Sequence, residues 1–261
     1  MAEQIFKDKI VLVTGSGRGI GRGIALKFAQ SGADVVVNFF RNRKPAEATA
    51  AEIEKLGRRA LVVKANVGDI DALQNLFNQI KDTFGGLDVF INNAASGYNR
   101  PVMEQKVKGW DWTMDINARA FLFASQQAVA LMEERGGGQI VAITSPGGDR
   151  VMPDYVLVGA SKAALNALTR YLAVELAEKN IRVNAVSPGV VATDVIQHFE
   201  TLSQEGILEK IATATPAGRL VTPEDVAGVV AFLCSPEAEM ICGQIITVDG
   251  GLTLPLKTTN L

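Results

Sequence analysis

The chain of 261 residues has few of the side chains on which metal centres and disulfides depend. It contains one histidine, His198, and two cysteines, Cys234 and Cys242. A single histidine argues against a histidine-rich metal centre, and the cysteines do not have the CxxC spacing of a zinc or dithiol site. We therefore expect no metal site, and two reduced thiols in a cytoplasmic protein.

The chain also lacks a long apolar segment and an excess of charge of one sign. No stretch reaches the roughly 20 apolar residues that a membrane-spanning helix needs, and the N-terminal residues do not resemble a secretion signal. Lys and Arg number 26 and Asp and Glu 28, so the net charge is −2. This balance argues against duplex nucleic acid as the main partner, and we expect no membrane binding either.

What the sequence does have is a regular alternation of short runs rich in Val and Ile with longer amphipathic stretches. This rhythm is typical of repeated strand–helix units, and strands that are almost continuously apolar belong to parallel sheets covered on both faces. We therefore predict an α/β fold, a single doubly wound domain (1–261) with a seven-stranded parallel sheet. The predicted strands are Ile10–Thr14, Asp34–Asn38, Ala60–Lys64, Val89–Ile91, Gln139–Thr144, Ile181–Val186 and Ile245–Val248. The predicted helices include Gly21–Gln30, Ala46–Leu56, Ile70–Thr83, Trp112–Arg135, Asp154–Lys179 and Pro223–Leu233.

The least regular stretch is 193–219, which follows the sixth predicted strand and carries scattered apolar residues, Phe199 among them. Doubly wound sheets bind ligands at the carboxyl ends of their strands. The stretch is therefore a candidate lid over a substrate, with Phe199 as a substrate contact. A helical pair that packs on the sheet without gating is the alternative.

A glycine-rich turn follows the first predicted strand directly and leads into a helix. Glycines let the backbone approach a pyrophosphate, whose charge then meets the free N–H groups at the helix N-terminus. We predict that this turn binds a dinucleotide. The residues concerned are Gly15, Ser16, Arg18, Gly19, Ile20 and Gly21.

The second predicted strand ends without the carboxylate that NAD-selective sites typically place there. Arg41, Asn42 and Arg43 follow it, and Arg18 stands in the glycine turn. Guanidinium groups neutralise a ribose 2′-phosphate, and Arg41 and Arg43, with Arg18, are the candidates for this role. We therefore predict NADPH as the cofactor, with Arg18, Arg41 and Asn42 in contact with it. A solvated basic loop is the alternative for Arg43.

Several motifs, taken together, resemble the short-chain dehydrogenase/reductase superfamily over about residues 5–253. They are Thr14-Gly15-x3-Gly19-x-Gly21, Asn92-Asn93-Ala94-Ala95, Asn117, Ser145, Lys162, Ser187-Pro188-Gly189 and Val248-Asp249-Gly250-Gly251. The resemblance implies a nicotinamide-dependent oxidoreductase with one Rossmann-type domain, usually a tetramer. It also implies further cofactor contacts, from Asn66, Val67, Asn93, Ala94, Ala95, Lys162, Pro188, Gly189 and Val191.

The catalytic segment departs from the usual Tyr-x3-Lys pattern of the superfamily. Val158 stands at the usual tyrosine position, whereas Tyr155 precedes Lys162 with Tyr-x6-Lys spacing. That spacing, with Asn92–Gly97 and Gly109–Trp112, is similar to the bacterial NADPH-dependent enoyl-acyl-carrier-protein reductase III. On one continuous helix, offsets of four and of seven residues both keep the tyrosine on the face of the lysine.

The resemblance implies hydride transfer from NADPH to the β-carbon of a trans-2-enoyl thioester in fatty acid biosynthesis. Tyr155 would stabilise the resulting enolate, while Lys162 would bind the nicotinamide ribose and favour the polarised phenol. Ser145 would be auxiliary. Asn117, a poor helix former, would hold a water molecule or bend its helix.

The other aromatic residues receive weaker assignments. Tyr98 is expected to line the acyl pocket, and Trp110 and Trp112 are expected to pack in the core or in an interface. The sequence does not separate acyl carrier protein from coenzyme A, although a basic rim would favour the acidic carrier protein. The candidates for that rim are Arg100, Lys106 and Lys108.

Three other functions stay open. An enoyl- or dienoyl-CoA reductase and a 3-oxoacyl or carbonyl reductase belong to the same superfamily. A non-catalytic NADP(H) sensor is the third, although such a protein would not need the tyrosine and the lysine. The resemblance and the long Ala- and Leu-rich helices lead us to expect a homotetramer.

Overall fold

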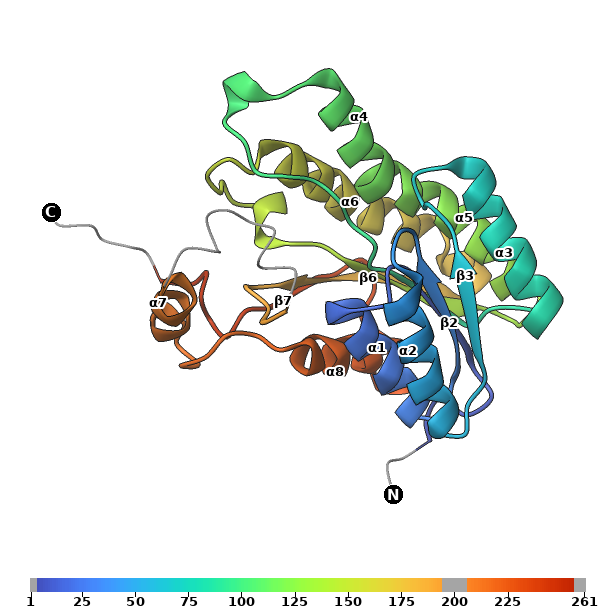
Figure 1. Ribbon diagram of the computed structural model, residues 1–261. Helices are drawn as coiled ribbons and strands as arrows, with labels where there is room; N and C mark the ends of the chain where they lie inside the picture. Colours follow the sequence, from blue (N-terminus) through green and yellow to red (C-terminus); the bar gives the residue numbers. More distant parts are fainter. Residues whose placement is uncertain (1–3, 194–205, 256–261) are drawn as a thin grey trace, which may run out of the picture.

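A parallel sheet of seven strands forms the centre of the molecule (Figure 1). The computed structural model describes residues 4–193 and 206–255, so Phe199, His198 and the part of the candidate lid from 194 to 205 lie outside the described residues. The strand order is β3-β2-β1-β4-β5-β6-β7, which confirms the predicted sheet. The strands are β1 (Ile10–Val13), β2 (Asp34–Phe39), β3 (Ala60–Lys64), β4 (Val89–Asn92), β5 (Gly138–Ile143), β6 (Ile181–Pro188) and β7 (Ile245–Val248).

The strand order reverses at β1, which pairs with β2 on one side and with β4 on the other. Leu12, for example, is in register with Val36 of β2 and with Phe90 of β4. In an open parallel sheet, a crevice forms outside the carboxyl ends of the strands at such a reversal. The residues that follow β1, β2 and β4 therefore meet at one edge of the sheet.

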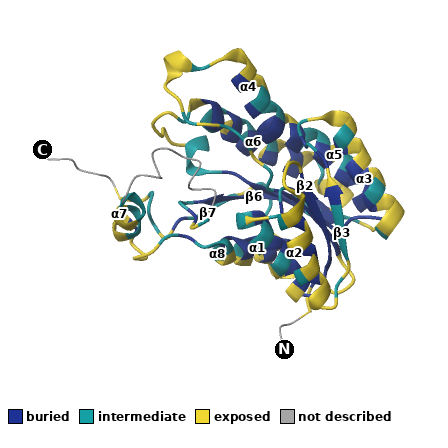
Figure 2. Ribbon diagram, in the orientation of Figure 1, coloured by how far each residue is buried: buried dark blue, intermediate teal, exposed yellow. Residues whose placement is uncertain are grey.

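Helices cover both faces of the sheet: α1, α2 and α8 lie on one face, and α3, α5 and α6 on the other (Figure 1). Val11 and Val13 of β1 pack in the core on the first face, whereas Leu12 packs in the core on the second. The inner strands are apolar on both sides for this reason, and Figure 2 shows them as buried, whereas the edge strands β3 and β7 are mostly of intermediate burial. The helices are α1 (Gly19–Gln30), α2 (Arg43–Lys55), α3 (Ile70–Phe84), α4 (Val107–Met114), α5 (Ala120–Glu133), α6 (Val156–Glu175), α7 (Ile207–Ala214) and α8 (Pro223–Cys234).

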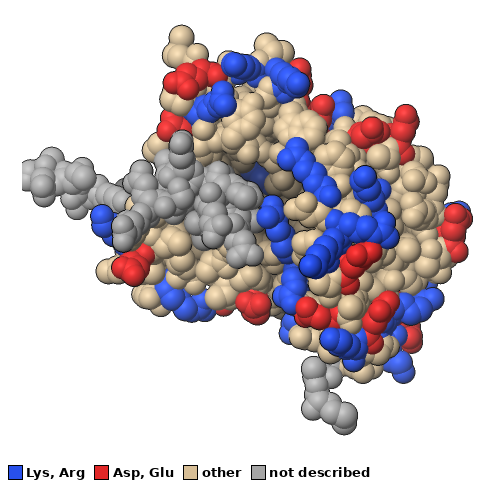
Figure 3. Space-filling view, viewed as in Figure 1, with Lys and Arg blue, Asp and Glu red and all other residues tan. Residues whose placement is uncertain are grey.

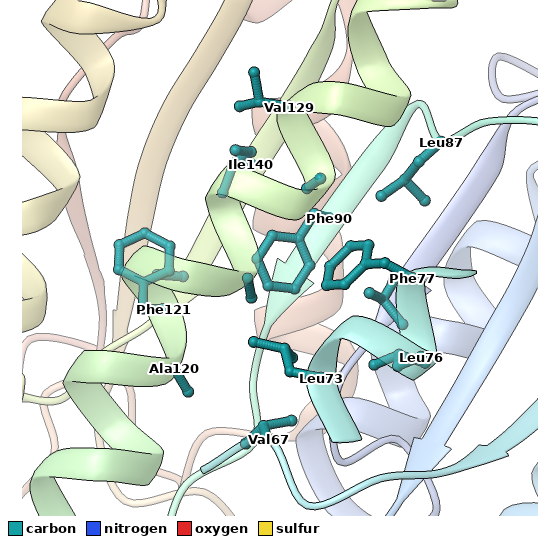
Figure 4. Close-up of a cluster of buried hydrophobic side chains, with 14 of the residues drawn as sticks. Val67, Leu73, Leu76, Phe77, Leu87, Phe90, Ala120, Phe121, Val129 and Ile140 are labelled. Atoms are coloured by element: carbon teal, nitrogen blue, oxygen red, sulfur yellow. The ribbon is translucent and has the colours of Figure 1, made fainter. Parts of the chain in front are cut away.

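One of the two cores is built around aromatic rings between the sheet and α3 (Figure 4). The rings of Phe90 on β4 and Phe77 on α3 lie 6.0 Å apart, with an angle of 80° between their planes. An edge-to-face pair of this kind stabilises by about 1 kcal/mol beyond the burial of its area. This core fixes the position of β4 beside β1, and with it the edge at which the site lies.

Two predicted helices differ from the structure by more than a few residues at their ends. The helix predicted over Trp112–Arg135 begins earlier, as α4, passes through a π-helical turn at Asp115–Arg119 and continues as α5. The helix predicted over Asp154–Lys179 is shorter, because Asp154 has a positive φ of 58° and the regular turns of α6 start only after Tyr155. None of the helices within 4–193 and 206–255 is long and apolar enough to cross a membrane.

Candidate active site

The glycine turn joins the end of β1 to the first turn of α1. Gly15 and Gly19 have φ angles of 65° and 55°, in the region that glycine adopts at least cost. A Cβ on Gly21 would lie 2.6 Å from the Gly15 carbonyl oxygen, so the turn packs tightly against the helix start. The N-cap residue, Arg18, makes no side-chain bond to the helix N–H groups. An open helix N-terminus behind a glycine turn fits a pyrophosphate.

Two side chains that directly follow β1 and β4 hold this turn in place. The Thr14 hydroxyl accepts hydrogen bonds from the backbone N–H groups of Asn93 and Ala94, each at 3.0 Å. The Asn93 amide donates to the Thr14 carbonyl at 2.8 Å and to the Gly15 carbonyl at 3.3 Å. Asn93, which the sequence predicted as a cofactor contact, therefore directs its side-chain amide to the glycine turn.

Asn38 at the end of β2 is a supporting residue that sequence reasoning missed. Its side-chain oxygen accepts from the Gly15 N–H at 3.2 Å, and its amide donates to the carbonyls of Val63 at 3.3 Å and Ala65 at 3.2 Å. The residue is 2% exposed, and a buried amide keeps its position only when its hydrogen bonds are made. The available signal was one polar residue within an otherwise apolar strand.

The basic residues predicted to select NADPH have different surroundings. Arg43 donates to the Glu47 carboxylate at 2.7 Å, one turn along α2, which favours the alternative of a solvated basic loop for this residue. Arg18 and Arg41 are exposed and have no ion pair within the part of the chain that the structure describes. Asn42 is the N-cap of α2, where its side chain makes no capping bond. Figure 3 shows Lys and Arg side chains along one side of a hollow in this face of the molecule.

The remaining predicted cofactor residues lie close to the carboxyl ends of strands. Asn66 follows β3 and accepts from the Gly68 N–H at 3.2 Å, and Gly189 follows β6, where a Cβ would lie 2.9 Å from the Cβ of Asp249. The structure thus brings this set to the edge where β1, β2 and β4 end. The other members of the set are Ser16, Ile20, Val67, Ala94, Ala95, Pro188 and Val191.

Tyr155 lies beside Ser145, with its phenol oxygen 3.5 Å from the Ser145 hydroxyl oxygen. The ring lies close against Gly147, where a Cβ would be 2.5 Å from two ring carbons. Burial raises the pKa of the Tyr155 phenol, an effect that the Ser145 hydrogen bond opposes. The phenol therefore keeps its proton at neutral pH and can donate a hydrogen bond.

Val158, at the usual tyrosine position of the superfamily, packs against the segment that follows β4. It is 7% exposed, and its side chain fills the space that a Cβ on Gly97 would need. Gly97 has a φ of 145°, which favours glycine there in any case. Tyr155 does not lie within one continuous helix with Lys162, as we expected, because it is the N-cap of α6 with non-helical backbone angles.

Lys162 is buried on α6 and donates to the Ile143 carbonyl at 2.7 Å. Burial lowers the pKa of this lysine to about 8. No hydrogen bond joins Lys162 to Tyr155 within 4–193 and 206–255. The structure therefore places the ammonium group at the end of β5, and its influence on the phenol would act through charge.

Asn117 lies in the π-helical turn and connects two elements of the site. Its side-chain oxygen accepts from the Ser96 N–H at 2.8 Å. Its amide donates to the Ser96 carbonyl at 2.8 Å and to the Ser161 hydroxyl at 2.9 Å. A π turn widens the helix locally, and such turns occur where helices bend. Here the side chain of Asn117 in this turn connects the segment after β4 to α6.

Tyr98, predicted to line the acyl pocket, is 39% exposed. The Arg100 guanidinium lies 5.0 Å from the centre of its ring, and its hydroxyl contacts Gly109 of α4. The structure thus places Tyr98 between the segment after β4 and the start of α4. The other predicted substrate residue, Phe199, lies outside the described residues.

The sequence and the fold are similar to those of known oxidoreductases. The sequence model of a family described as "Enoyl-(Acyl carrier protein) reductase" matches residues 15–253. The chain belongs to the short-chain dehydrogenase/reductase superfamily.

Curated members of the superfamily match nearly the whole chain. A hydroxynaphthalene reductase-like protein of Metarhizium robertsii is 38% identical, with 93% of this chain and 94% of that protein covered. A 1-cyclohexenylcarbonyl-CoA reductase of Streptomyces collinus is 37% identical, with 95% and 88% covered. These relatives are named after different substrates, so the likeness shows the superfamily and not the substrate.

Solved structures of the superfamily share the fold closely. A 7α-hydroxysteroid dehydrogenase in complex with NADH and 7-oxo glycochenodeoxycholic acid has a TM-score of 0.89 at 34% identity, with 95% and 96% of the two chains covered. A short-chain dehydrogenase of Burkholderia cenocepacia J2315 in complex with NADP has a TM-score of 0.87 at 35% identity, with 95% and 98% covered. Each of these proteins holds a nicotinamide dinucleotide.

Proposed function

We propose that this protein is an NADPH-dependent reductase of trans-2-enoyl thioesters. The observation that carries the proposal is the place of the tyrosine, which lies at position 155, just before α6, and not at position 158 within the helix. Tyr155 has its hydroxyl 3.5 Å from Ser145, while position 158 holds a buried valine against Gly97. The description of the matching family and the Streptomyces relative, a reductase of a cyclohexenylcarbonyl thioester, support the same reading.

The glycine turn and the basic residues beside it would hold the cofactor. The N–H groups at the start of α1 would bind the pyrophosphate, and Arg18 and Arg41 would bind a ribose 2′-phosphate. When bound, NADPH supplies the hydride that reduces the carbon–carbon double bond. Arg18 follows β1 and Arg41 follows β2, at the edge of the sheet where the crevice forms, so both are within the region where the adenosine end would lie.

The displaced tyrosine suits an enoyl thioester for a geometric reason. In a carbonyl compound, the carbon that receives the hydride also bears the oxygen that needs the hydrogen-bond donor. In an enoyl thioester, the hydride adds to the β-carbon, two atoms from the thioester carbonyl carbon. A donor set back along the chain, as Tyr155 is relative to position 158, would reach the oxygen on which the negative charge develops.

Carbonyl reduction is the second candidate. The pair formed by Ser145 and Tyr155 is also suited to a ketone, and the Metarhizium relative carries the name of a hydroxynaphthalene reductase-like protein. The two candidates differ in the carbon that accepts the hydride, the carbonyl carbon of a ketone or the β-carbon of an enoyl thioester. An enoyl and a 3-oxoacyl thioester of the same chain length therefore distinguish them.

The decisive experiment follows NADPH oxidation by the purified protein with a trans-2-enoyl thioester and with the 3-oxoacyl thioester of the same chain length. We expect turnover of the enoyl compound, and weaker turnover when NADH replaces NADPH. Turnover of the 3-oxoacyl compound alone would overturn the proposal in favour of carbonyl reduction. Cofactor binding without turnover of either would point to a sensor. Coenzyme A and acyl-carrier-protein thioesters, assayed in parallel, identify the carrier.

The pKa of Lys162 predicts the pH dependence of this reaction. Burial lowers it to about 8, so the ammonium charge is present below about pH 8 and is lost as the pH rises through that value. Because this charge would stabilise negative charge near Tyr155, we expect kcat for the enoyl substrate to fall on the alkaline side of about pH 8. Stopped assays across the pH range measure this.

A Lys162→Met variant provides the control for the pH profile. It removes the titrating group, so its residual kcat should show no inflection near pH 8. If the alkaline fall persists in the variant, another group causes it. If the wild-type rate rises through the same range, the proposed role of the charge is wrong.

A further inference from the structure

Arg41 reaches from the end of β2 to an aromatic residue on α4. Its guanidinium carbon lies 6.0 Å from the centre of the Trp112 ring and 5.8 Å from the centre of the Phe40 ring. At these distances a guanidinium group is attracted to the face of an aromatic ring. No carboxylate among the described residues pairs with Arg41, and its guanidinium lies near these two rings instead.

Trp112 is itself held in place through its indole N–H, which donates to the Ser96 hydroxyl at 2.8 Å. Ser96 is in turn fixed by two hydrogen bonds to the side chain of Asn117, each at 2.8 Å. The sequence predicted a packing role for Trp112, and the residue does pack against the core beneath α4. Its ring therefore has a fixed position from which it can orient a mobile partner.

We propose that Trp112 is a positioning residue for the recognition of a ribose 2′-phosphate, because its fixed ring orients Arg41 toward the dinucleotide crevice. The inference rests on the proposed use of NADPH. The rings attract the Arg41 guanidinium without accepting its N–H groups as a carboxylate would, so these donors can bind a phosphate. An arginine that is already oriented loses less side-chain freedom on binding than one that is free in solvent.

The proposal makes a prediction that a purely structural role would not make. Removal of the ring, in Trp112→Leu, should weaken binding of 2′,5′-ADP by about two- to fivefold, the size of one cation–π contact. Binding of 5′-ADP, which lacks the 2′-phosphate, should not change. Trp112→Phe keeps an aromatic face and should recover most of the affinity. Isothermal titration of the full-length protein measures all three.

Matched variants separate this inference from the proposed cofactor preference. Trp110→Leu, which changes the other tryptophan two residues away, should leave both affinities unchanged. Arg41→Ala should remove the preference for 2′,5′-ADP. If the wild type shows no such preference, or keeps it in Arg41→Ala, the proposed cofactor recognition fails. If Arg41→Ala loses the preference but Trp112→Leu keeps it, only the role of Trp112 is overturned.

Fluorescence gives an independent readout that needs no change at Trp112. The chain has two tryptophans, so Trp110→Phe leaves Trp112 as the single emitter. If Arg41 stays over the ring when it binds a phosphate, neutralisation of its charge should shift the emission with 2′,5′-ADP but not with 5′-ADP. An emission that saturating 2′,5′-ADP leaves unchanged would overturn the proposal even if Trp112→Leu failed to fold.

Discussion

Replacement of Tyr155 by phenylalanine is expected to lower the turnover of an enoyl thioester by about 100-fold or more, with the affinity for NADPH unchanged. The variant removes one oxygen atom and keeps the ring that lies against Gly147. The fold should therefore survive, and the loss should appear in kcat. Steady-state assays with NADPH and a trans-2-enoyl thioester, together with direct titration of NADPH, measure the two quantities.

The size of this effect follows from the surroundings of the phenol. Burial raises the pKa of Tyr155, so the group is a protonated donor at neutral pH, held 3.5 Å from Ser145. A hydrogen bond given to a developing oxyanion in a site shielded from water stabilises the transition state more than it would in bulk water. Ser145→Ala should cost less, because Ser145 would act mainly by orienting the phenol.

Tyr171→Phe is the matched control. Tyr171 lies on α6 as well, but it is 68% exposed and far along the helix from the site. The loss of its hydroxyl should leave kcat and KM within about twofold of the wild type, as is usual for surface substitutions. If Tyr155→Phe behaved like this control, Tyr155 would not be the donor, and the donor would have to be sought near Ser145.

The sheet was predictable from sequence because its strands lie between two layers of helices and the five inner strands are buried. Each strand is a short, nearly continuous apolar run, and all seven runs became strands of one parallel sheet. The glycine turn was predictable for a related reason, since Gly15 and Gly19 adopt positive φ angles that favour glycine. Features that depend on local backbone chemistry were thus visible in the sequence.

Features that depend on contacts across the fold were not visible. The π turn at Asp115–Arg119 leaves the apolar pattern of α4 and α5 nearly intact, so the pattern alone predicted one regular helix. Asn38 interrupts the apolar sequence of β2, and only the sheet register brings it to the Gly15 N–H and to the carbonyls of Val63 and Ala65. From the sequence, Arg43 had the same predicted role as Arg41, but α2 places Glu47 one turn from Arg43, where the two form an ion pair.

The position of the tyrosine in the catalytic segment was predictable only in part. The sequence pointed to Tyr155 through the spacing to Lys162, and the structure places its hydroxyl next to Ser145. The reason could not be read from spacing, because Tyr155 lies at the N-cap of α6 and not within it. Val158 packs against Gly97, which is far from it in the chain, and this contact also could not be predicted from the spacing.

Gly21→Ala should produce the second large effect, a loss of NADPH affinity of at least about tenfold. A Cβ at this position would lie 2.5 Å from the Asn93 side-chain nitrogen and 2.6 Å from the Gly15 carbonyl oxygen. The Asn93 amide could move only by giving up its hydrogen bonds to the turn, and the Gly15 carbonyl is backbone. The turn itself must shift, and the N–H groups that would meet a pyrophosphate shift with it.

Gly228→Ala separates this effect from the general cost of adding a methyl group to a helix. Gly228 lies in α8, is exposed and has no atom within 4 Å of an added Cβ, so alanine there should raise stability by up to about 1 kcal/mol. NADPH binding should not change in this variant. Thermal unfolding with and without NADPH tests both substitutions, because a bound ligand raises the midpoint only where the site is intact. If Gly21→Ala kept the full NADPH-dependent rise, the glycine turn would not be the binding site for the pyrophosphate.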